Sequence, residues 1–127
     1  MSKLRKIRIA LIAHDGKKEK MLEFVKERYD FFNQEDVLIV ATGTTGKLIQ
    51  DSNVCNVTCV NSGPLGGDAE IGAMVSTNLL DLVIFFRDPL GKHPHEPDVQ
   101  MLMRLCDVHN VPLSTNYASA NLILKSI

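Results

Sequence analysis

Hydrophobic residues gather in five short runs along this chain, and these runs predict β-strands. They are rich in β-branched and other apolar residues and are nearly continuous rather than alternating. The runs are Ile7 to Ala13, Val37 to Ala41, Val57 to Val60, Leu82 to Phe86 and Val111 to Leu113. Continuous runs of this length are typical of strands that are buried on both faces of a parallel sheet.

The segments between these runs have the spacing of amphipathic helices. The predicted helices are Lys17 to Phe32, Thr44 to Asp51, Ala69 to Leu79, Pro97 to His109 and Ser119 to Ile127. In the first of them, the residues that lie close to one face are Met21, Phe24, Val25, Tyr29 and Phe32. Strands that alternate with helices predict right-handed crossovers. The expected fold is a Rossmann-like α/β protein, a three-layer α/β/α sandwich with a five-stranded parallel sheet, in one domain over residues 1–127.

Composition narrows the class of protein. The chain has 127 residues, 45% of them hydrophobic, and a net charge of −1, which argues against the basic surface of a nucleic-acid-binding protein. No apolar stretch approaches the length of a membrane span. Three cysteines, Cys55, Cys59 and Cys106, are an odd number and favour a reducing compartment. We therefore expect a cytoplasmic protein that does not bind nucleic acid or membranes.

Polar, titratable and glycine-rich residues follow each predicted strand. The segments are His14 to Lys18, Thr42 to Lys47, Asn61 to Asp68, Arg87 to Asp98 and Ser114 to Asn116. The carboxyl ends of parallel strands meet at one edge of the sheet, where ligands bind in open α/β folds. Turns need many of these residue types anyway, but three loops that supply His-Asp, Gly-Asp and His-Glu-Pro-Asp predict a functional site at this edge.

The loop from Thr42 to Gly46 predicts an anion site. It passes from a strand into a helix and offers the hydroxyls of Thr42, Thr44 and Thr45 and the N–H groups of a helix start, including that of Gly43. It is not a Walker A loop, because Leu48 stands where a magnesium-binding Ser or Thr is required. Ser62 with Gly63, and Lys18, are candidates to complete a site for a small phosphorylated molecule. The alternative is that a threonine simply caps the helix.

Asp68 and His95 are the candidate acid-base residues. Asp68 follows Gly66 and Gly67 at a predicted helix start, where it is either a general base or an N-cap. His95 lies in a proline-bracketed loop before Asp98, where it can polarise a carbonyl with Asp98 or Asp15 fixing its tautomer, or simply be an exposed loop residue. A zinc or iron centre is a further alternative. Its ligands would come from His14, Asp15, Asp88, His93 and His95.

Five segments in order along the chain resemble the methylglyoxal synthase family. They are Ile12 to Asp15, Ala41 to Gly46, Ser62 to Asp68, Phe86 to Pro89 and Pro94 to Asp98. The resemblance implies conversion of dihydroxyacetone phosphate to methylglyoxal and inorganic phosphate, in a cytoplasmic homohexamer with no metal and no organic cofactor. Phosphate would be the product and also an inhibitor.

The resemblance also implies a role for each matching residue. Asp68 would be the base, His95 would polarise the carbonyl and move protons, and Asp98 and Asp15 would support this network. The residues that would bind substrate are His14, Lys18, Thr42, Gly43, Thr44, Thr45, Ser62, Gly63 and His95. Asp88 and Arg104 match family positions with either a site or a structural role.

The chain departs from the family pattern in three places. Glu96 and Leu65 stand where many members have Asp and Met. Members commonly continue past the last helix with a tail that includes a basic residue, whereas this sequence ends at Ile127. The main alternative function is a non-catalytic regulatory domain of the same fold that binds a phosphorylated metabolite, and a metal-dependent hydrolase is the third.

Overall fold

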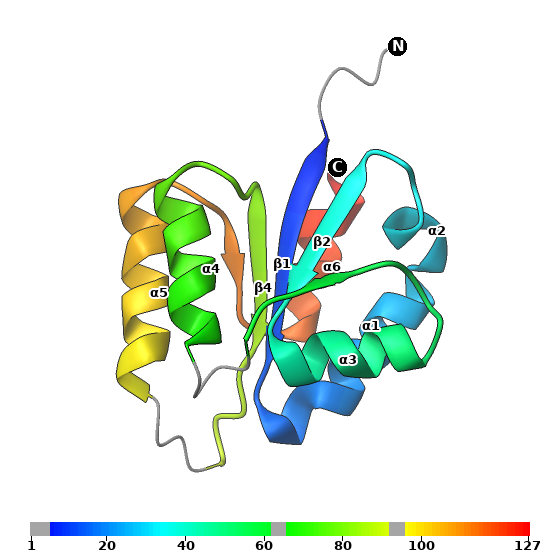
Figure 1. Ribbon diagram of the computed structural model, residues 1–127, viewed down its shortest axis with the longest axis horizontal. Helices are drawn as coiled ribbons and strands as arrows, with labels where there is room; N and C mark the ends of the chain where they lie inside the picture. Colours follow the sequence, from blue (N-terminus) through cyan, green and yellow to red (C-terminus); the bar gives the residue numbers. More distant parts are fainter. Residues whose placement is uncertain (1–5, 62–65, 92–95) are drawn as a thin grey trace.

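The computed structural model describes residues 6–61, 66–91 and 96–127, without the side chains of residues 96–98. Its centre is a parallel sheet of five strands in the order β3-β2-β1-β4-β5 (Figure 1). The strands are β1 (Ile7–Ala13), β2 (Val37–Ala41), β3 (Thr58–Cys59), β4 (Leu82–Phe86) and β5 (Leu113–Ser114). The predicted fold class is therefore confirmed, and the strand order is added to it.

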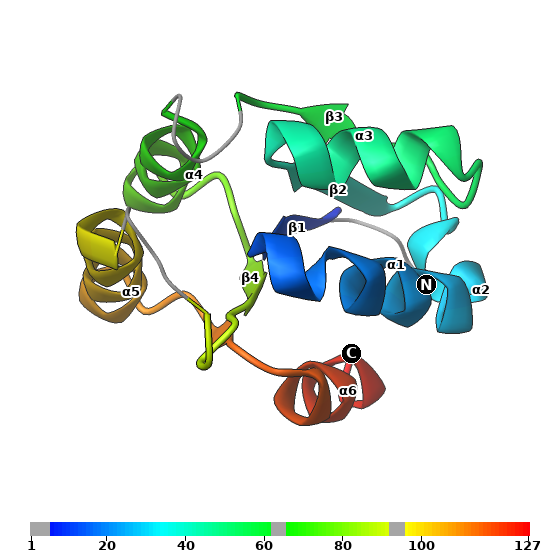
Figure 2. The ribbon, with the colours of Figure 1, turned by 90° about the horizontal axis from the view of Figure 1, so that it is seen from below.

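Helices cover both faces of the sheet. They are α1 (Lys18–Glu27), α2 (Tyr29–Phe32), α3 (Gly43–Asp51), α4 (Gly67–Ser76), α5 (Glu96–Val108) and α6 (Tyr117–Lys125). Figure 2 shows α4 and α5 on one side of the sheet and α1, α3 and α6 on the other. Side chains alternate between the two faces along β1, so Ile9 and Leu11 pack with α1, α3 and α6, while Ala10 and Ile12 pack with α4 and α5. None of the helices within the described ranges is both long enough and apolar enough to span a membrane.

The first predicted helix, Lys17 to Phe32, is not continuous in the structure, so this prediction is wrong. A short 3-10 turn, η1 (Asp15–Lys17), precedes α1, and Arg28 separates α1 from α2 with φ −114° and ψ 38°. Because this break turns the second segment, the Tyr29 side chain is 53% exposed, although the helical pattern placed it on the buried face. Met21 and Phe24 are buried as expected.

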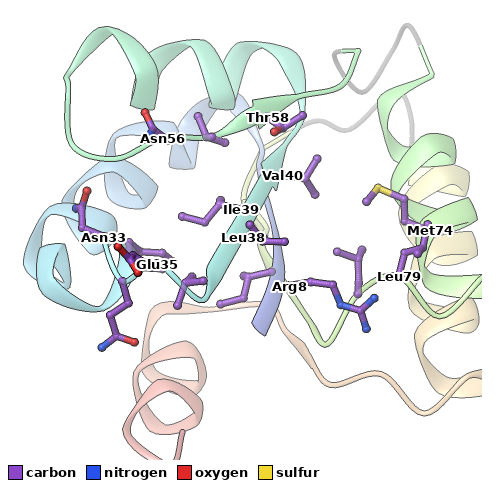
Figure 3. Close-up of a pocket in the computed structure, with 16 residues that line it drawn as sticks. Arg8, Asn33, Glu35, Leu38, Ile39, Val40, Asn56, Thr58, Met74 and Leu79 are labelled. Carbon is purple, nitrogen blue, oxygen red and sulfur yellow. The ribbon is translucent and has the colours of Figure 1, made fainter. Parts of the chain in front are cut away.

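The prediction that every strand is buried on both faces is also wrong. β3 is only two residues long and exposed, and β5 begins two residues later than predicted, because each of these edge strands pairs with a neighbour on one side only. On the side of α4 and α5, the face of β2 lines a groove of about 620 Å³ (Figure 3). Leu38 of β2 and Leu79, beyond the end of α4, are 46% and 49% exposed there.

Candidate active site at the carboxyl edge of the sheet

The chain changes direction in the sheet between β1 and β4. After β1 it continues through α1 to β2, while after β4 it continues through α5, on the opposite face, to β5. The crevice beyond the carboxyl ends of β1 and β4 is therefore the topological switch point, where ligands bind in open α/β sheets. Figure 2 views the molecule from this edge. Of the residues expected from the sequence, those that the structure describes include His14 after β1, Thr42 after β2 and Asp68 at the start of α4.

His14 follows β1 directly and contacts the end of β4. Its backbone N–H donates to the Phe86 carbonyl oxygen (3.1 Å), and its Nδ1 accepts from the backbone N–H of Asp88 (3.0 Å). The imidazole is 6% exposed and meets the Phe85 ring edge to face, with 5.1 Å between ring centroids. Because Phe85 belongs to the core under α4 and α5, the His14 ring lies on that side of the sheet.

Lys18 and Asp15 form an ion pair beside this histidine. The Lys18 Nζ donates to Asp15 Oδ1 (2.5 Å) and to the Ala13 carbonyl oxygen at the end of β1 (3.2 Å). The Lys18 side chain is only 19% exposed, whereas that of Asp15 is fully exposed. The ammonium group is thus held at the carboxyl edge, where it can serve as a charge for an anionic ligand.

The predicted anion loop forms the start of α3. Thr42 occupies the N-cap position, but its side chain makes no capping hydrogen bond, so simple capping does not explain this residue. The backbone N–H of Gly43 is already used, because it donates to the Asn61 carbonyl oxygen (3.2 Å). Thr45 is 1% exposed, and its Oγ1 has no hydrogen-bond partner among the described residues. A buried hydroxyl of this kind needs a partner, and Thr45 is therefore the best-supported donor of this loop; Thr44 is exposed.

Asp68 lies in the first turn of α4 and is not its N-cap. Gly66 takes that position with φ 104°, a left-handed conformation that favours glycine, and the helix begins at Gly67. The Asp68 side chain is 1% exposed, and both of its carboxylate oxygens are buried. Glu70 of the same turn accepts from the Asn61 N–H (3.0 Å), which connects the end of β3 to α4.

Several expected site residues lie outside the described part of the chain. These are Ser62, Gly63, His93 and His95, and the side chain of Asp98, whose backbone is in the first turn of α5. Arg104 is exposed on α5. Among the residues that the structure describes, no group of three or more His, Cys, Asp and Glu side chains could hold a metal ion.

Arg87 and the backbone of Asp88, for which the sequence predicted no role, also lie at this edge. Arg87 follows β4 directly, and its Nη1 lies 3.8 Å from the Met103 sulfur of α5. Asp88 accepts the Leu90 N–H through Oδ1 (3.1 Å) and packs against Gly16. The position of a basic residue directly after a predicted strand could have indicated that Arg87 lies at this edge. Nothing local in the sequence indicates that the Asp88 N–H reaches His14, 74 residues away.

Comparison with known proteins agrees with this arrangement. Residues 20–115 match the family of the MGS-like domain. A methylglyoxal synthase of Carboxydothermus hydrogenoformans is 53% identical over 121 residues, which are 95% of this chain and 98% of that protein. One from Acholeplasma laidlawii is 53% identical over the same shares. The crystal structure of methylglyoxal synthase from Elizabethkingia anophelis is 42% identical, with a TM-score of 0.85 over 94% of this chain and 77% of that one.

Proposed function

Because the chain belongs to the methylglyoxal synthase family, we propose that it converts dihydroxyacetone phosphate into methylglyoxal and inorganic phosphate. The observation that best supports this reaction is the buried carboxylate of Asp68 in the first turn of α4. It lies on the same side of the sheet as the His14 ring, at the edge where ligands of such folds bind.

Asp68 is the base in the first step. Its carboxylate removes a proton from the hydroxyl-bearing carbon next to the substrate carbonyl, and the carbonyl oxygen becomes the oxygen of an enediolate. The N-terminus of α4 stabilises the negative charge of the carboxylate before the transfer. The exclusion of water around both carboxylate oxygens limits competing proton exchange.

Phosphate leaves in the second step. The hydroxyl oxygen of the enediolate loses its proton and becomes the aldehyde oxygen, the carbon–carbon double bond moves to the carbon that bears the phosphate, and the carbon–oxygen bond to phosphate breaks. The resulting enol then takes up a proton on its terminal carbon to become methylglyoxal. The reaction needs no oxidant or reductant. Thr45 and Lys18 are the described residues best placed to hold the phosphate group, and Thr42, Gly43, Thr44, Ser62 and Gly63 complete the expected binding set. The carbon–oxygen bond must stand out of the enediolate plane for this elimination.

His95 polarises the carbonyl and moves protons between the oxygens, supported by Asp98 and Asp15. This part of the proposal rests on the family resemblance. The exposed carboxylate of Asp15 holds the Lys18 ammonium in place, so Asp15 acts on phosphate binding as well.

Substitution of Asp68 by Asn tests the proposed base. Asp68→Asn removes the proton acceptor but keeps the shape of the side chain, so we expect turnover of dihydroxyacetone phosphate to be lost while a phosphorylated enediolate mimic still binds. Asp51→Asn, on the exposed surface of α3, is the matched control and keeps full activity. Near-normal turnover in Asp68→Asn contradicts the assignment of the base.

The same assay separates the alternatives. Methylglyoxal formation that a chelator does not change supports the synthase. Binding of dihydroxyacetone phosphate without turnover supports a regulatory domain, and activity that is lost on chelation supports a metal-dependent hydrolase.

We also propose a cytoplasmic homohexamer whose subunits each form one domain over residues 1–127. Three free cysteines fit a reducing compartment. The apolar groove along β2, with Leu38 and Leu79 exposed beside it, is the candidate surface for contact between subunits.

A further inference from the structure

The hydrogen bond between Asp88 and His14 determines which imidazole nitrogen is protonated. The Asp88 backbone N–H donates to His14 Nδ1 at 3.0 Å. A backbone N–H group can only donate a hydrogen bond, so Nδ1 must be an unprotonated acceptor. A neutral imidazole then has its proton on Nε2. Turning the ring over would place a carbon atom against the N–H and leave this part-buried donor without the acceptor.

We infer that the Asp88 backbone N–H fixes His14 as the neutral Nε2–H tautomer, which makes His14 a hydrogen-bond donor to the substrate and excludes it as a base. Asp88 is thereby a positioning residue, acting through its main chain. The substrate part of this inference rests on the proposed function, whereas the tautomer stands on the geometry alone.

Three contacts hold the Asp88 amide in place. The Asp88 carboxylate accepts the Leu90 N–H, which closes a tight turn after β4. The same carboxylate lies against Gly16, where an added Cβ would come within 2.3 Å of Oδ2. The His14 N–H bonds to the Phe86 carbonyl oxygen, two residues before the amide in question. The donor and the acceptor are therefore both fixed by the pairing of β1 with β4.

A neutral donor suits the chemistry of this site. His14 Nε2 is buried, and a buried donor directed at the oxygen that gains charge lowers the barrier without reorganisation. Asp68 and His14 then divide the work on one side of the sheet: Asp68 accepts the proton, and His14 stabilises the enediolate oxygen. In this proposal the enediolate oxygen receives a hydrogen bond from His14 in addition to the role that the family resemblance implies for His95.

Nitrogen NMR of the histidine rings tests the tautomer directly. In the full-length protein labelled with ¹⁵N-histidine, at neutral pH, His14 is assigned as the signal that disappears in His14→Gln. We expect a protonated Nε2 and an unprotonated Nδ1, while the exposed His109, directly after α5, shows fast exchange between tautomers. An Nδ1–H tautomer or a doubly protonated ring at His14 overturns the inference, whatever the activity of the protein.

Two variants then test the donor. In His14→Gln the amide nitrogen can replace Nε2–H, and in His14→Asn the amide oxygen can replace Nδ1 but no donor reaches the Nε2 position. We expect His14→Asn to lower kcat/KM by roughly 10²- to 10³-fold and His14→Gln to lose far less. His109→Gln is the control. Equal losses in both variants, with both proteins folded by circular dichroism, overturn the donor role.

Asp88 variants connect the spectrum to the positioning residue. Asp88→Asn keeps an acceptor for the Leu90 N–H and is expected to keep the His14 tautomer, whereas Asp88→Ala opens the turn and allows both tautomers. An unchanged spectrum in Asp88→Ala contradicts the positioning role. A protein that shows the expected spectrum but forms no methylglyoxal supports the tautomer and contradicts the proposed function, so the two failures are distinguishable.

Discussion

The three cysteines differ in the environment of their thiol groups. Cys106 is 1% exposed and Cys55 is 9% exposed, and burial raises the pKa of each thiol to about 11. Cys59, on the edge strand β3, is exposed. Only a thiolate is a good nucleophile, so the two buried residues act as small apolar side chains.

Reaction with a disulfide reagent measures this difference. A reagent can reach the Cys59 thiol in the folded protein, whereas Cys55 and Cys106 are buried. We therefore expect Cys59 alone to react rapidly in the folded protein and all three cysteines to react after unfolding in guanidinium. Cys59→Ser should abolish the rapid phase and leave the other two thiols for the unfolded state. Two rapid thiols in the native protein contradict the burial of Cys55 or Cys106.

At the scale of the elements, asparagine ends three helices. Asn53, Asn78 and Asn110 follow the caps of α3, α4 and α5, and each has a positive φ, between 55° and 63°. After α4, the Leu79 N–H bonds to the Met74 carbonyl oxygen (2.8 Å) and the Asn78 N–H to that of Val75 (3.2 Å). This is the Schellman arrangement, and it satisfies carbonyl groups that the helix leaves open.

Substitutions of Asn78 test this helix end. The residue is exposed, so its backbone conformation determines the effect. Because a Cβ in the left-handed region costs about 1 kcal/mol and asparagine tolerates it better than alanine, we expect Asn78→Ala to lower the free energy of unfolding by about that amount. Asn78→Gly should be at least as stable as the parent protein. Urea denaturation compares them, and equal stability of the two variants would contradict the explanation.

The sequence was sufficient to predict the features that depend on a local pattern of residues. Continuous apolar runs located the central strands β1, β2 and β4, and the polar loops after β1, β2 and β3 located His14, Thr42 and Asp68 at one edge. It was insufficient to predict hydrogen bonds in which a backbone N–H group finds its acceptor in a distant segment of the chain. The Gly43 N–H donates to the Asn61 carbonyl oxygen, and the Asp88 N–H reaches His14, because the order of strands brings these segments together.

The prediction that the strands are buried on both faces was wrong because of the way the helices are arranged over the whole sheet. Helices α4 and α5 extend over β1 and β4, and so the face of β2 on their side remains open beside Leu38 (Figure 3). An apolar run therefore predicts that a strand is buried, but it does not indicate whether residues of the same chain or of another subunit cover it. The Leu38 and Leu79 side chains, half exposed at this groove, fit burial by another subunit.

Charge placed in this groove tests the proposed assembly. Leu38→Lys or Leu79→Lys puts an ammonium group at an apolar contact, so we expect the homohexamer to dissociate into smaller species in sedimentation velocity experiments. Leu122→Lys, on the outer surface of α6 where the residue is 68% exposed, is the control and stays hexameric. Hexamers of unchanged size in both groove variants would assign the subunit contact to another surface.

The central position of β1 has a consequence during protein synthesis. β1 and β2 pair with only η1, α1 and α2 between them, so this unit can form as soon as residue 41 is available. The other side of β1 pairs with β4, which is translated about 40 residues later. Until then β1 has an unpaired edge, which is a site for wrong pairing with other chains. Closure of that edge also brings Asp88 to His14, so the nascent chain acquires this part of the site only when the open edge of β1 is covered.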